Sequence, residues 1–293
     1  MTAQPAATHS LQLGDGIVVT FVADGSIHVP HHIFLGQDGS PELWTDHPEY
    51  ADADGLLLMS LGAILVEVSG TRVLIDLGVG PVDIDLEPVV GAPGSMSGGS
   101  LINELNKLDI DVDDIDAVLL SHLHPDHVGW LTTDTASGPK LTFGRAEHLV
   151  AKAEHQFWED PANAGRASGP SPVQQAALNE ARLTYLEDRP NPVPEITTMF
   201  TPGHTPGHCS FVIASSAARA IVLGDCMHCP VEISHPHLAG QSDVDIDLGK
   251  ASRARLQVEL DRPNTICIAP HFPDYVFGRV VTTGSTRQFV RLN

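Results

Sequence analysis

Short apolar runs rich in β-branched residues recur along the chain, and Gly, Pro, Asp or Ser separates one run from the next. This pattern is typical of β-strands that bury one or both faces in a sheet. It predicts strands at residues 17–23, 63–68, 72–76, 117–120, 210–214, 220–223 and 265–269. Helical patterns lie between several of these runs, so the order predicts sheets covered by helices.

Apolar residues three or four positions apart mark the predicted helices. Ser100 is placed to cap a helix that carries Leu101, Leu105 and Leu108 on one face. Ser171 and Pro172 form a cap and a first helical residue, and they predict a helix over 173–186. Residues 145–157 and 250–260 are also predicted to be helical, whereas the Gly- and Pro-rich segments 89–99 and 160–172 are predicted loops.

Composition narrows the class of protein. The 293 residues include 16 Lys and Arg against 37 Asp and Glu, a net charge of −21, which excludes a nucleic-acid partner because clustered cations are lacking. Met1–Leu11 lacks the cations and apolar stretch of a secretory signal, and 56–68 is too short to span a bilayer, so we expect a cytoplasmic protein without a membrane partner. No linker divides the chain, so one domain over 1–293 is expected. Four cysteines in this length are expected to be reduced thiols.

Histidine is unusually frequent, with 16 residues, and the densest group directly follows the predicted strand 117–120. His122, His124, Asp126 and His127 lie within six residues, and Pro125 disfavours a regular helix there. Imidazole and carboxylate are ligands that suit zinc. The run therefore predicts a metal-binding loop, although a chance polar loop is the alternative.

One loop cannot complete two metal shells, and three further polar residues follow other apolar runs. His204 lies in a Gly/Pro turn before strand 210–214, Asp225 follows strand 220–223, and His271 follows strand 265–269. Each would be unremarkable alone. Their shared position at strand ends predicts that they join the same site.

Together with Asp76, these motifs resemble the metallo-β-lactamase-fold hydrolases. The resemblance implies an α/β fold, a four-layer αβ/βα sandwich in which helices flank two mixed β-sheets. It also implies that His122, His124 and His204 hold one metal ion, that Asp126, His127 and His271 hold a second, and that Asp225 bridges them. Asp76 would be a supporting residue, although an Asp before Gly is also common in plain turns.

A narrower similarity joins residues 224–228, 269–273 and 277–280 to the methyl parathion hydrolase and lactonase-like branch. By analogy, His228 would lie beside the metals and contribute to catalysis. In related enzymes the N-terminal loops wall the active site, so residues 1–55 are expected to contribute to that wall. Within them, His31, His32, Phe34 and Trp44 are candidates for substrate contact, with ordinary packing as the alternative.

The chemistry expected of two divalent cations, zinc or else iron or manganese, is hydrolysis by a bridging hydroxide. Asp126 and Asp225, besides ligating, could accept the proton released on attack. The expected substrate is a small, neutral and partly apolar lactone, carboxylic ester or phosphotriester. Whether the chain forms a homodimer stays open.

Other activities use the same ligands and remain alternatives. Iron in the site would permit an oxygenase, and β-lactam ring opening needs the same attack. A glutathione-thioester hydrolase would need cations, for which Arg279, Arg287 and Arg291 are available. A non-catalytic binder is the remaining class, but such proteins typically lose ligands, and all seven positions are filled here.

The remaining histidines and cysteines have plain explanations. His208, His235 and His237 lie in Pro-containing turns and are expected at the surface or beside the ligands. Cys226 and Cys229 have the spacing of a redox or zinc pair, but no second close pair accompanies them, so packing is the default.

Overall fold

Two β-sheets form the centre of the protein, which we describe from a computed structural model over residues 2–35, 44–238, 243–284 and 286–292. The strands are β1 (His9–Gly14), β2 (Ile17–Val29), β3 (Leu57–Val68), β4 (Thr71–Ile75), β5 (Asp83–Asp85), β6 (Ser95–Ser97), β7 (Ala117–Leu119), β8 (Thr132–Thr135), β9 (Gly138–Leu141), β10 (Glu147–Val150), β11 (Leu183–Tyr185), β12 (Ile196–Phe200), β13 (Cys209–Ala214), β14 (Arg219–Val222), β15 (Thr265–Ile268), β16 (Phe277–Thr283) and β17 (Thr286–Arg291).

The helices and short 3-10 turns lie between the strands along the chain. They are α1 (His32–Leu35), α3 (Glu87–Val90), α4 (Leu101–Lys107), α5 (Pro125–Val128), α6 (Lys152–Glu159), α7 (Pro172–Glu180), α8 (Val231–Ser234) and α9 (Ile246–Leu260), with 3-10 turns η1 (Pro48–Tyr50), η2 (Val112–Asp114), η3 (Gly129–Leu131) and η4 (Gly224–Cys226).

Both large sheets are mixed. The first has the order β11-β10-β7-β4-β3-β2-β6-β5, with β1 also paired to β2, and its strands β4, β7, β10 and β11 run parallel. The second has the order β12-β13-β14-β15-β16-β17, and only β14 and β15 are parallel neighbours. Strands β8 and β9 form a separate hairpin.

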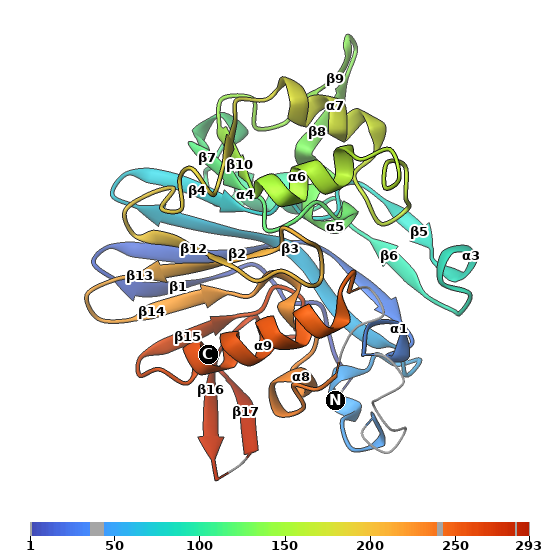
Figure 1. Cartoon of the computed structure of the whole chain (residues 1–293), viewed down its shortest axis with the longest axis vertical. Helices are drawn as coiled ribbons and strands as arrows, with labels where there is room; N and C mark the ends of the chain where they lie inside the picture. The colour runs from blue at the N-terminus through green and yellow to red at the C-terminus, as the bar shows by residue number, and fades with distance from the viewer. Residues whose placement is uncertain (1, 36–43, 239–242, 285, 293) are drawn as a thin grey trace.

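The inner faces of the two sheets make the main core. Phe21 and Ile64 of the first sheet share one buried cluster with Phe211, Val222 and Ile268 of the second. Burial of such side chains stabilises the folded state by roughly 1.5–3 kcal/mol each. The strands therefore act as two facing layers, which Figure 1 shows between the upper and lower helices.

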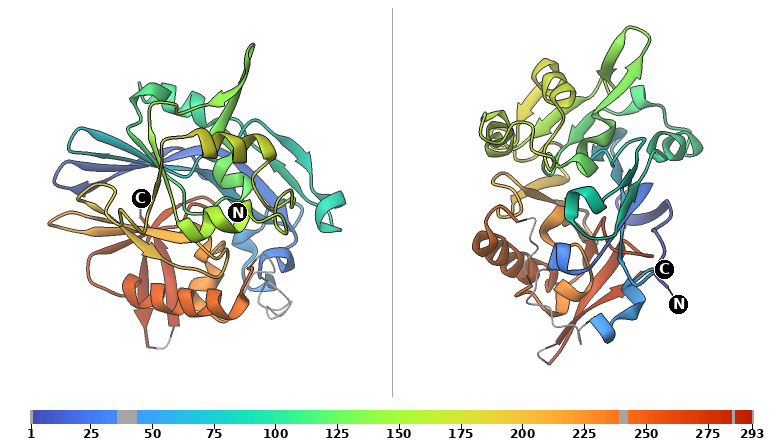
Figure 2. Two further views of the ribbon diagram at one scale, coloured as in Figure 1. Left: turned by 45° about the horizontal axis from the view of Figure 1, so that its top comes forward. Right: turned by 90° about the vertical axis from the view of Figure 1, so that its right-hand side faces the viewer.

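Helices cover the outer face of each sheet. Leu101 and Leu105 of α4 belong to a second buried cluster with Leu74 and Val118 of the first sheet. On the other side, Leu256 of α9 packs in a cluster with the second sheet. Figure 2 shows the green to yellow segments on one side of the molecule and the orange helix α9 on the other. The expected four-layer αβ/βα sandwich is thus confirmed.

Three of the predicted segments were wrong in part. Residues 145–157, predicted as a helix, hold β10 before α6, because 147–150 pair with strands on both sides. The helix predicted over 173–186 ends at Glu180 and is followed by β11, and the predicted loop 89–99 contains β6. Leu108 lies beyond the end of α4 and is 36% exposed, so it does not share the buried face. Tertiary strand pairing overrides the local pattern in the first two cases.

Strand β2 is longer than predicted, and a register shift between Ala23 and Gly25 bends it. A Cβ on Gly25 would lie 1.8 Å from the Ser97 carbonyl oxygen, so only glycine permits β6 to pair here. This pairing places the second half of β2 beside β6 and α3, where they line the cavity described below.

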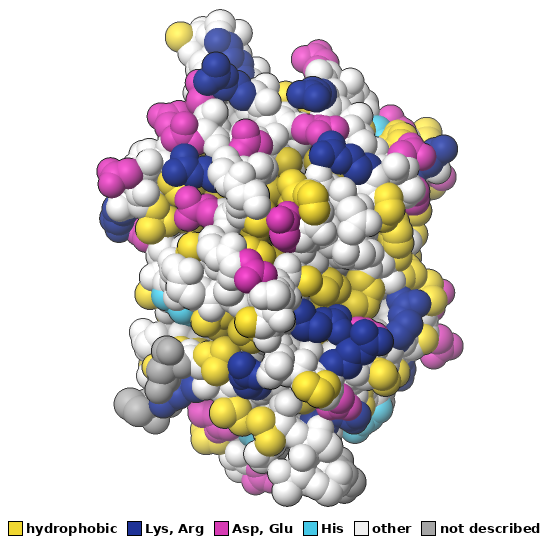
Figure 3. Space-filling model, turned by 90° about the vertical axis from the view of Figure 1, so that its left-hand side faces the viewer, with side chains coloured by type: hydrophobic (Ala, Val, Ile, Leu, Met, Phe, Trp, Pro, Cys, Tyr) yellow, Lys and Arg dark blue, Asp and Glu magenta, His cyan; other side chains and the backbone are white. Residues whose placement is uncertain are grey.

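The surface carries charged side chains of both signs (Figure 3). On the face in Figure 3, Lys and Arg side chains lie near Asp and Glu side chains. Among the ion pairs of the described residues, Arg287 lies 2.6 Å from Asp261 and Arg219 lies 2.9 Å from Glu259. Across the described ranges, no helix is long and apolar enough to cross a membrane.

Candidate metal centre

The predicted ligands all follow the carboxyl ends of strands. Parallel β4 and β7 end at the same edge of the first sheet, where Asp76 and the 122–127 run follow. In the second sheet β13 is antiparallel to both β12 and β14, so β12, β14 and β15 share one direction. His204, Asp225 and His271 follow these three strands, and the topology therefore brings both groups to one place.

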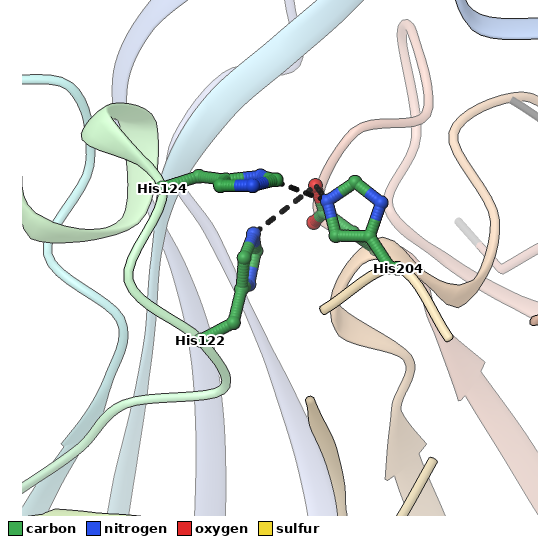
Figure 4. Close-up of side chains that lie close together, drawn as sticks. His122, His124 and His204 are labelled. Atoms are coloured by element: carbon green, nitrogen blue, oxygen red, sulfur yellow. Dashed lines mark hydrogen bonds and ion pairs between the residues drawn. The ribbon is translucent and has the colours of Figure 1, made fainter. Parts of the chain in front are cut away.

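The first predicted group is assembled as expected. Ligand atoms of His122, His124, His204 and Asp225 lie within 4.8 Å of one another. His204 Nε2 is 2.9 Å from His124 Nδ1 and 3.2 Å from Asp225 Oδ2, and His122 Nε2 is 3.6 Å from the same oxygen. Figure 4 shows His122 and His124 reaching the centre from one loop and His204 from the opposite side.

The second predicted group lies against the other oxygen of Asp225. Asp126, His127 and His271 also form a group with ligand atoms within 4.8 Å. Asp225 Oδ1 is 3.0 Å from His127 Nε2 and 2.9 Å from His271 Nε2. Asp225 thus faces one set of imidazoles with each oxygen, which is the placement that a bridging carboxylate requires.

Four of the imidazoles are hydrogen-bonded at Nδ1, so the neutral form of each ring carries its lone pair on Nε2. Nδ1–H can only donate to a carboxylate or carbonyl oxygen, which fixes the tautomer. The Ser121 hydroxyl donates to Asp76 and therefore accepts from its histidine. The pairs are His127 with Asp76 at 2.9 Å, His271 with the Ser60 carbonyl at 3.0 Å, His204 with Asp243 at 3.2 Å and His122 with Ser121 at 3.1 Å.

This donor set fits a cation better than it fits a hydrogen-bond network. His124 Nδ1 and His204 Nε2 lie 2.9 Å apart, and the Nε2 atoms of His127 and His271 lie 3.2 Å apart, so the imidazole nitrogens converge in pairs around Asp225. His122 Nε2 is buried and has no hydrogen-bond partner among the described residues. Imidazole nitrogens and carboxylate oxygens converging in this way are typical ligands of zinc and related divalent metals.

The electrostatics of the cluster are set by burial and by Asp225. Burial lowers the pKa of His122 and His124 well below the ordinary value. Burial also opposes charge on His204, but the Asp225 and Asp243 carboxylates outweigh it and raise its pKa to about 9. Burial opposes ionisation of Asp225, yet the surrounding imidazoles hold its pKa well below the usual range. A buried carboxylate that stays ionised among imidazole nitrogens attracts a cation.

Asp76 supports the cluster, as the resemblance implied. Its side chain accepts hydrogen bonds from the Ser121 backbone and hydroxyl, both at 2.8 Å, and from His127. Its φ of +60° lets the chain turn directly after β4. One carboxylate thereby orients the candidate ligand His127 directly and His122 through the Ser121 hydroxyl.

His208 and His228 are both buried beside the cluster. His208 Nε2 accepts a hydrogen bond from the Asp225 backbone at 2.9 Å, and its Nδ1–H donates to the Thr201 carbonyl at 3.1 Å. His228 Nε2 is 3.4 Å from Asp225 Oδ2, and its ring lies 4.9 Å from that of Phe34. The surface option for His208 was wrong, whereas the position expected of His228 beside the ligands is the one observed.

Three groups that support the cluster were not predicted from the sequence. Asp243 orients His204, and the Ser60 carbonyl orients His271. The buried Glu154 carboxylate accepts from the Leu123 and Gly207 backbones at 3.0 and 3.1 Å and so joins the two ligand loops. A carbonyl leaves no signal in the sequence, and an Asp or Glu outside any motif leaves almost none.

A cavity of about 380 Å³ opens onto the cluster. Its polar lining includes His124, Asp126, His204 and Asp225, and no Lys or Arg occurs among its described lining residues. Its apolar lining consists of Ile27, Val29, Ile33, Phe34, Leu86, Val89, Val90, Met96, Pro125 and Ala167. A larger groove of about 680 Å³ lies around Arg72 and contains none of the predicted site residues. The smaller cavity is therefore the candidate substrate site.

The remaining candidates are not among the described lining residues of this cavity. His235 is half-buried and His237 exposed, and His31 stacks on Trp44 at 4.6 Å. Arg287 pairs with Asp261, and the Arg291 guanidinium lies 4.5 Å from the Tyr275 ring centre.

The cysteines give no sign of a redox or zinc pair. All four are free and buried, and burial raises the pKa of Cys226 to about 11. Cys229 is shifted upward as well, because burial opposes its ionisation. Both are therefore thiols near neutral pH, in line with packing.

Comparison with known proteins gives one family. The sequence model that represents the Metallo-beta-lactamase superfamily matches residues 63–271 of this chain. The chain is 30% identical to the N-acyl homoserine lactonase AttM of Agrobacterium fabrum over 128 residues, which are 42% of this chain and 44% of AttM. It is 21% identical to the N-acyl homoserine lactonase AiiA of Bacillus thuringiensis subsp. kurstaki over 176 residues, 57% of this chain and 64% of AiiA. The matches thus span less than two thirds of these curated relatives.

Solved structures resemble almost the whole chain. AidC, a dizinc quorum-quenching lactonase in complex with a product, superposes with a TM-score of 0.80 and 23% identity over 98% of both chains. The hydrolase AbOPH superposes with a TM-score of 0.77 and 23% identity over 99% of both chains. These likenesses establish a common fold.

Proposed function

The chain belongs to the metallo-beta-lactamase superfamily, and from this premise we propose that it hydrolyses a neutral lactone that carries an apolar acyl chain. The observation that carries the proposal is the cavity itself, which is apolar over most of its lining and ends on the His/Asp cluster. No described Lys or Arg lines it, so an anionic group would find no cationic side chain there. The lactonase relatives AttM and AiiA support the choice of a lactone.

We propose two divalent cations, zinc in preference to iron or manganese. His122, His124 and His204 would hold one, and Asp126, His127 and His271 the other, with Asp225 between them. When bound, such cations polarise a carbonyl oxygen and lower the pKa of a water toward neutrality.

Asp126 is the carboxylate best placed to move a proton. Its side chain is 22% exposed and lines the cavity, whereas the Asp225 side chain is 4% exposed and surrounded by imidazoles. Asp126 would accept the proton of the attacking water and return it to the ring oxygen as the ester bond breaks. Asp225 would hold the imidazoles in place, and His228 would pack behind it.

The N-terminal segment supplies much of the apolar wall. Ile27 and Val29 come from β2, and Ile33 and Phe34 from α1. Each methylene that enters such a wall gains about 0.8 kcal/mol, which is about a fourfold gain in kcat/KM. Activity should therefore rise with acyl length until the cavity is full.

The test measures metal content and then turnover of five substrates with one preparation: an N-acyl homoserine lactone, an aryl ester, a phosphotriester, a thioester and a β-lactam. We expect two bound cations and a preference for the lactone. Oxygen consumption tests for an iron oxygenase. Preferred turnover of another substrate class, or oxygen uptake without hydrolysis, would contradict the proposal.

A matched pair of variants connects activity to the cluster. His122 and His148 are both fully buried, but His148 lies in β10 outside the cluster. His122→Gln should lose cation uptake and turnover, and His148→Gln should keep both. Full turnover by His122→Gln without bound metal would reject the proposed centre.

A further inference from the structure

We propose that Asp243, held by Arg253, is a positioning residue that sets the affinity of the cation bound through His204. The inference rests on the metal centre proposed above. The Asp243–Arg253 ion pair is buried and lies outside the family's ligand motifs. Through Arg253 it joins helix α9 to two of the turns that carry candidate ligands.

Asp243 lies between a fixed cation and a ligand. Its Oδ2 is 2.9 Å from Arg253 Nη2, and its Oδ1 is 3.2 Å from His204 Nδ1. Both Asp243 and Arg253 have side chains that are at most 1% exposed. Because the carboxylate can only accept, it keeps the proton on Nδ1 and leaves the His204 Nε2 lone pair directed at the centre.

Arg253 also reaches the turn that carries Asp225. Its Nη1 lies 3.4 Å from the carbonyl oxygen of Cys226, the residue after Asp225. One guanidinium is therefore placed between the turn after β12 and the turn after β14. Its Nε has no hydrogen-bond partner among the described residues, so the guanidinium makes these contacts through its two Nη atoms.

The backbone fixes the same arrangement. Val244 N–H donates to the His204 carbonyl at 3.0 Å, and Asp245 N–H donates to the Gly203 carbonyl at 2.9 Å. A Cβ on Gly249 would lie 2.5 Å from Asp243 Oδ2, so glycine leaves the room that the carboxylate occupies. Asp243 is thus held on two sides before it orients His204.

Stability alone gives a weak reason for this pair. Removing two charges from water costs more than their attraction commonly returns, and apolar replacements of buried pairs are often neutral or stabilising. Groups that orient a metal-ligating histidine, in contrast, typically change metal affinity by about 10–100-fold when removed. The position of Asp243 on Nδ1 of a predicted ligand matches the second role.

The test compares two double variants that differ in one acceptor. Asp243→Asn with Arg253→Met removes both charges and keeps an oxygen for His204 Nδ1–H, whereas Asp243→Ala with Arg253→Met removes the oxygen as well. Each chelated protein is titrated with Zn²⁺ by calorimetry, and its Tm is measured without metal. We expect the alanine variant to bind one of two zinc ions about 10–100-fold more weakly than the asparagine variant.

A control and two outcomes make the test decisive. Asp24→Asn alters another buried carboxylate, which accepts from Val79, Gly80 and Trp130 and contacts no predicted ligand, so zinc affinity should stay at the wild-type value. Equal zinc affinity in the two double variants would overturn the role of Asp243 and leave the proposed function standing. The same holds if zinc affinity falls only in proportion to the fall in Tm. A wild-type chain that takes up no cation would overturn the proposed function, and with it the inference.

Discussion

Replacing Gly224 by alanine should disturb the turn that carries Asp225. Gly224 has φ +56°, and a Cβ there would lie 2.5 Å from His208 Nε2 and 3.0 Å from its Cε1. The same Nε2 accepts the Asp225 N–H at 2.9 Å, so the new methyl group must push the ring off its hydrogen bond. Left-handed backbone costs a non-glycine residue about 1–2 kcal/mol. An unmade buried hydrogen bond costs about 1–3 kcal/mol more.

The expected total is about 2–5 kcal/mol of unfolding free energy. At this chain length 1 kcal/mol lowers Tm by about 2 °C, so the variant should melt roughly 4–10 °C below wild type. Urea and thermal unfolding of the chelated protein measure the loss without contributions from bound metal. Zinc titration of the same samples should show weaker binding, because Asp225 is displaced.

A double-mutant cycle isolates the contact with His208. In the His208→Ala background the clash is absent, so Gly224→Ala should cost only the backbone strain of about 1–2 kcal/mol. Gly91→Ala is the matched control, because Gly91 has φ +70° and a Cβ there would meet nothing within 4 Å. It should lose a similar 1–2 kcal/mol and keep its zinc affinity. An equal cost of Gly224→Ala in both backgrounds would refute the reasoning.

Three further predictions use stability as the readout. Burial lowers the pKa of His148 to about 4 in the folded protein. As pH falls, this histidine is therefore protonated in the unfolded chain before it is protonated in the folded protein. The stability present above pH 6.5 is lost as pH falls toward 4. Relative to His148→Gln, wild type should lose about 2 kcal/mol more between pH 7 and 5 in urea titrations, and parallel curves would contradict this. Ser60→Ala removes one acceptor from the Ala6 N–H and one donor to the Phe272 carbonyl, so about 1–3 kcal/mol and the exchange protection of the Ala6 amide should be lost. An unchanged amide exchange rate would be inconsistent with that contact. Zinc at about 100-fold above its Kd should stabilise wild type by about 2.7 kcal/mol, measured as a rise in Tm that His122→Gln does not show.

The sequence identified the candidate ligands because their signal is local. His122, His124, Asp126 and His127 lie within six residues and follow an apolar run. His204 precedes another apolar run, and Asp225 and His271 each follow one. An apolar run that ends in a polar side chain can be recognised from the sequence without knowing which strands lie beside it in the sheet. The structure brings all seven candidate ligands into two adjoining groups, and the family match covers the segment that contains them.

Only the tertiary structure decided the elements whose local pattern was ambiguous. The local sequence of residues 147–150 fits the start of a helix, because a short apolar run is compatible with both helical and strand periodicity. Their pairing with β7 and β11 makes them a strand. The burial of His208 likewise depends on Thr201 and Asp225, which are separated from it by 7 and 17 residues.

The sequence by itself determined which residues offer nitrogen and oxygen ligands and that they follow strands. The tertiary structure decided which atoms of those residues face the centre. Asp243 reaches His204 across 39 positions, and the Ser60 carbonyl reaches His271 across 211. The physical reason is that a hydrogen bond depends on distance and direction in space. A sheet brings together segments that are far apart along the chain, and their sequence separation does not predict which of them will be in contact.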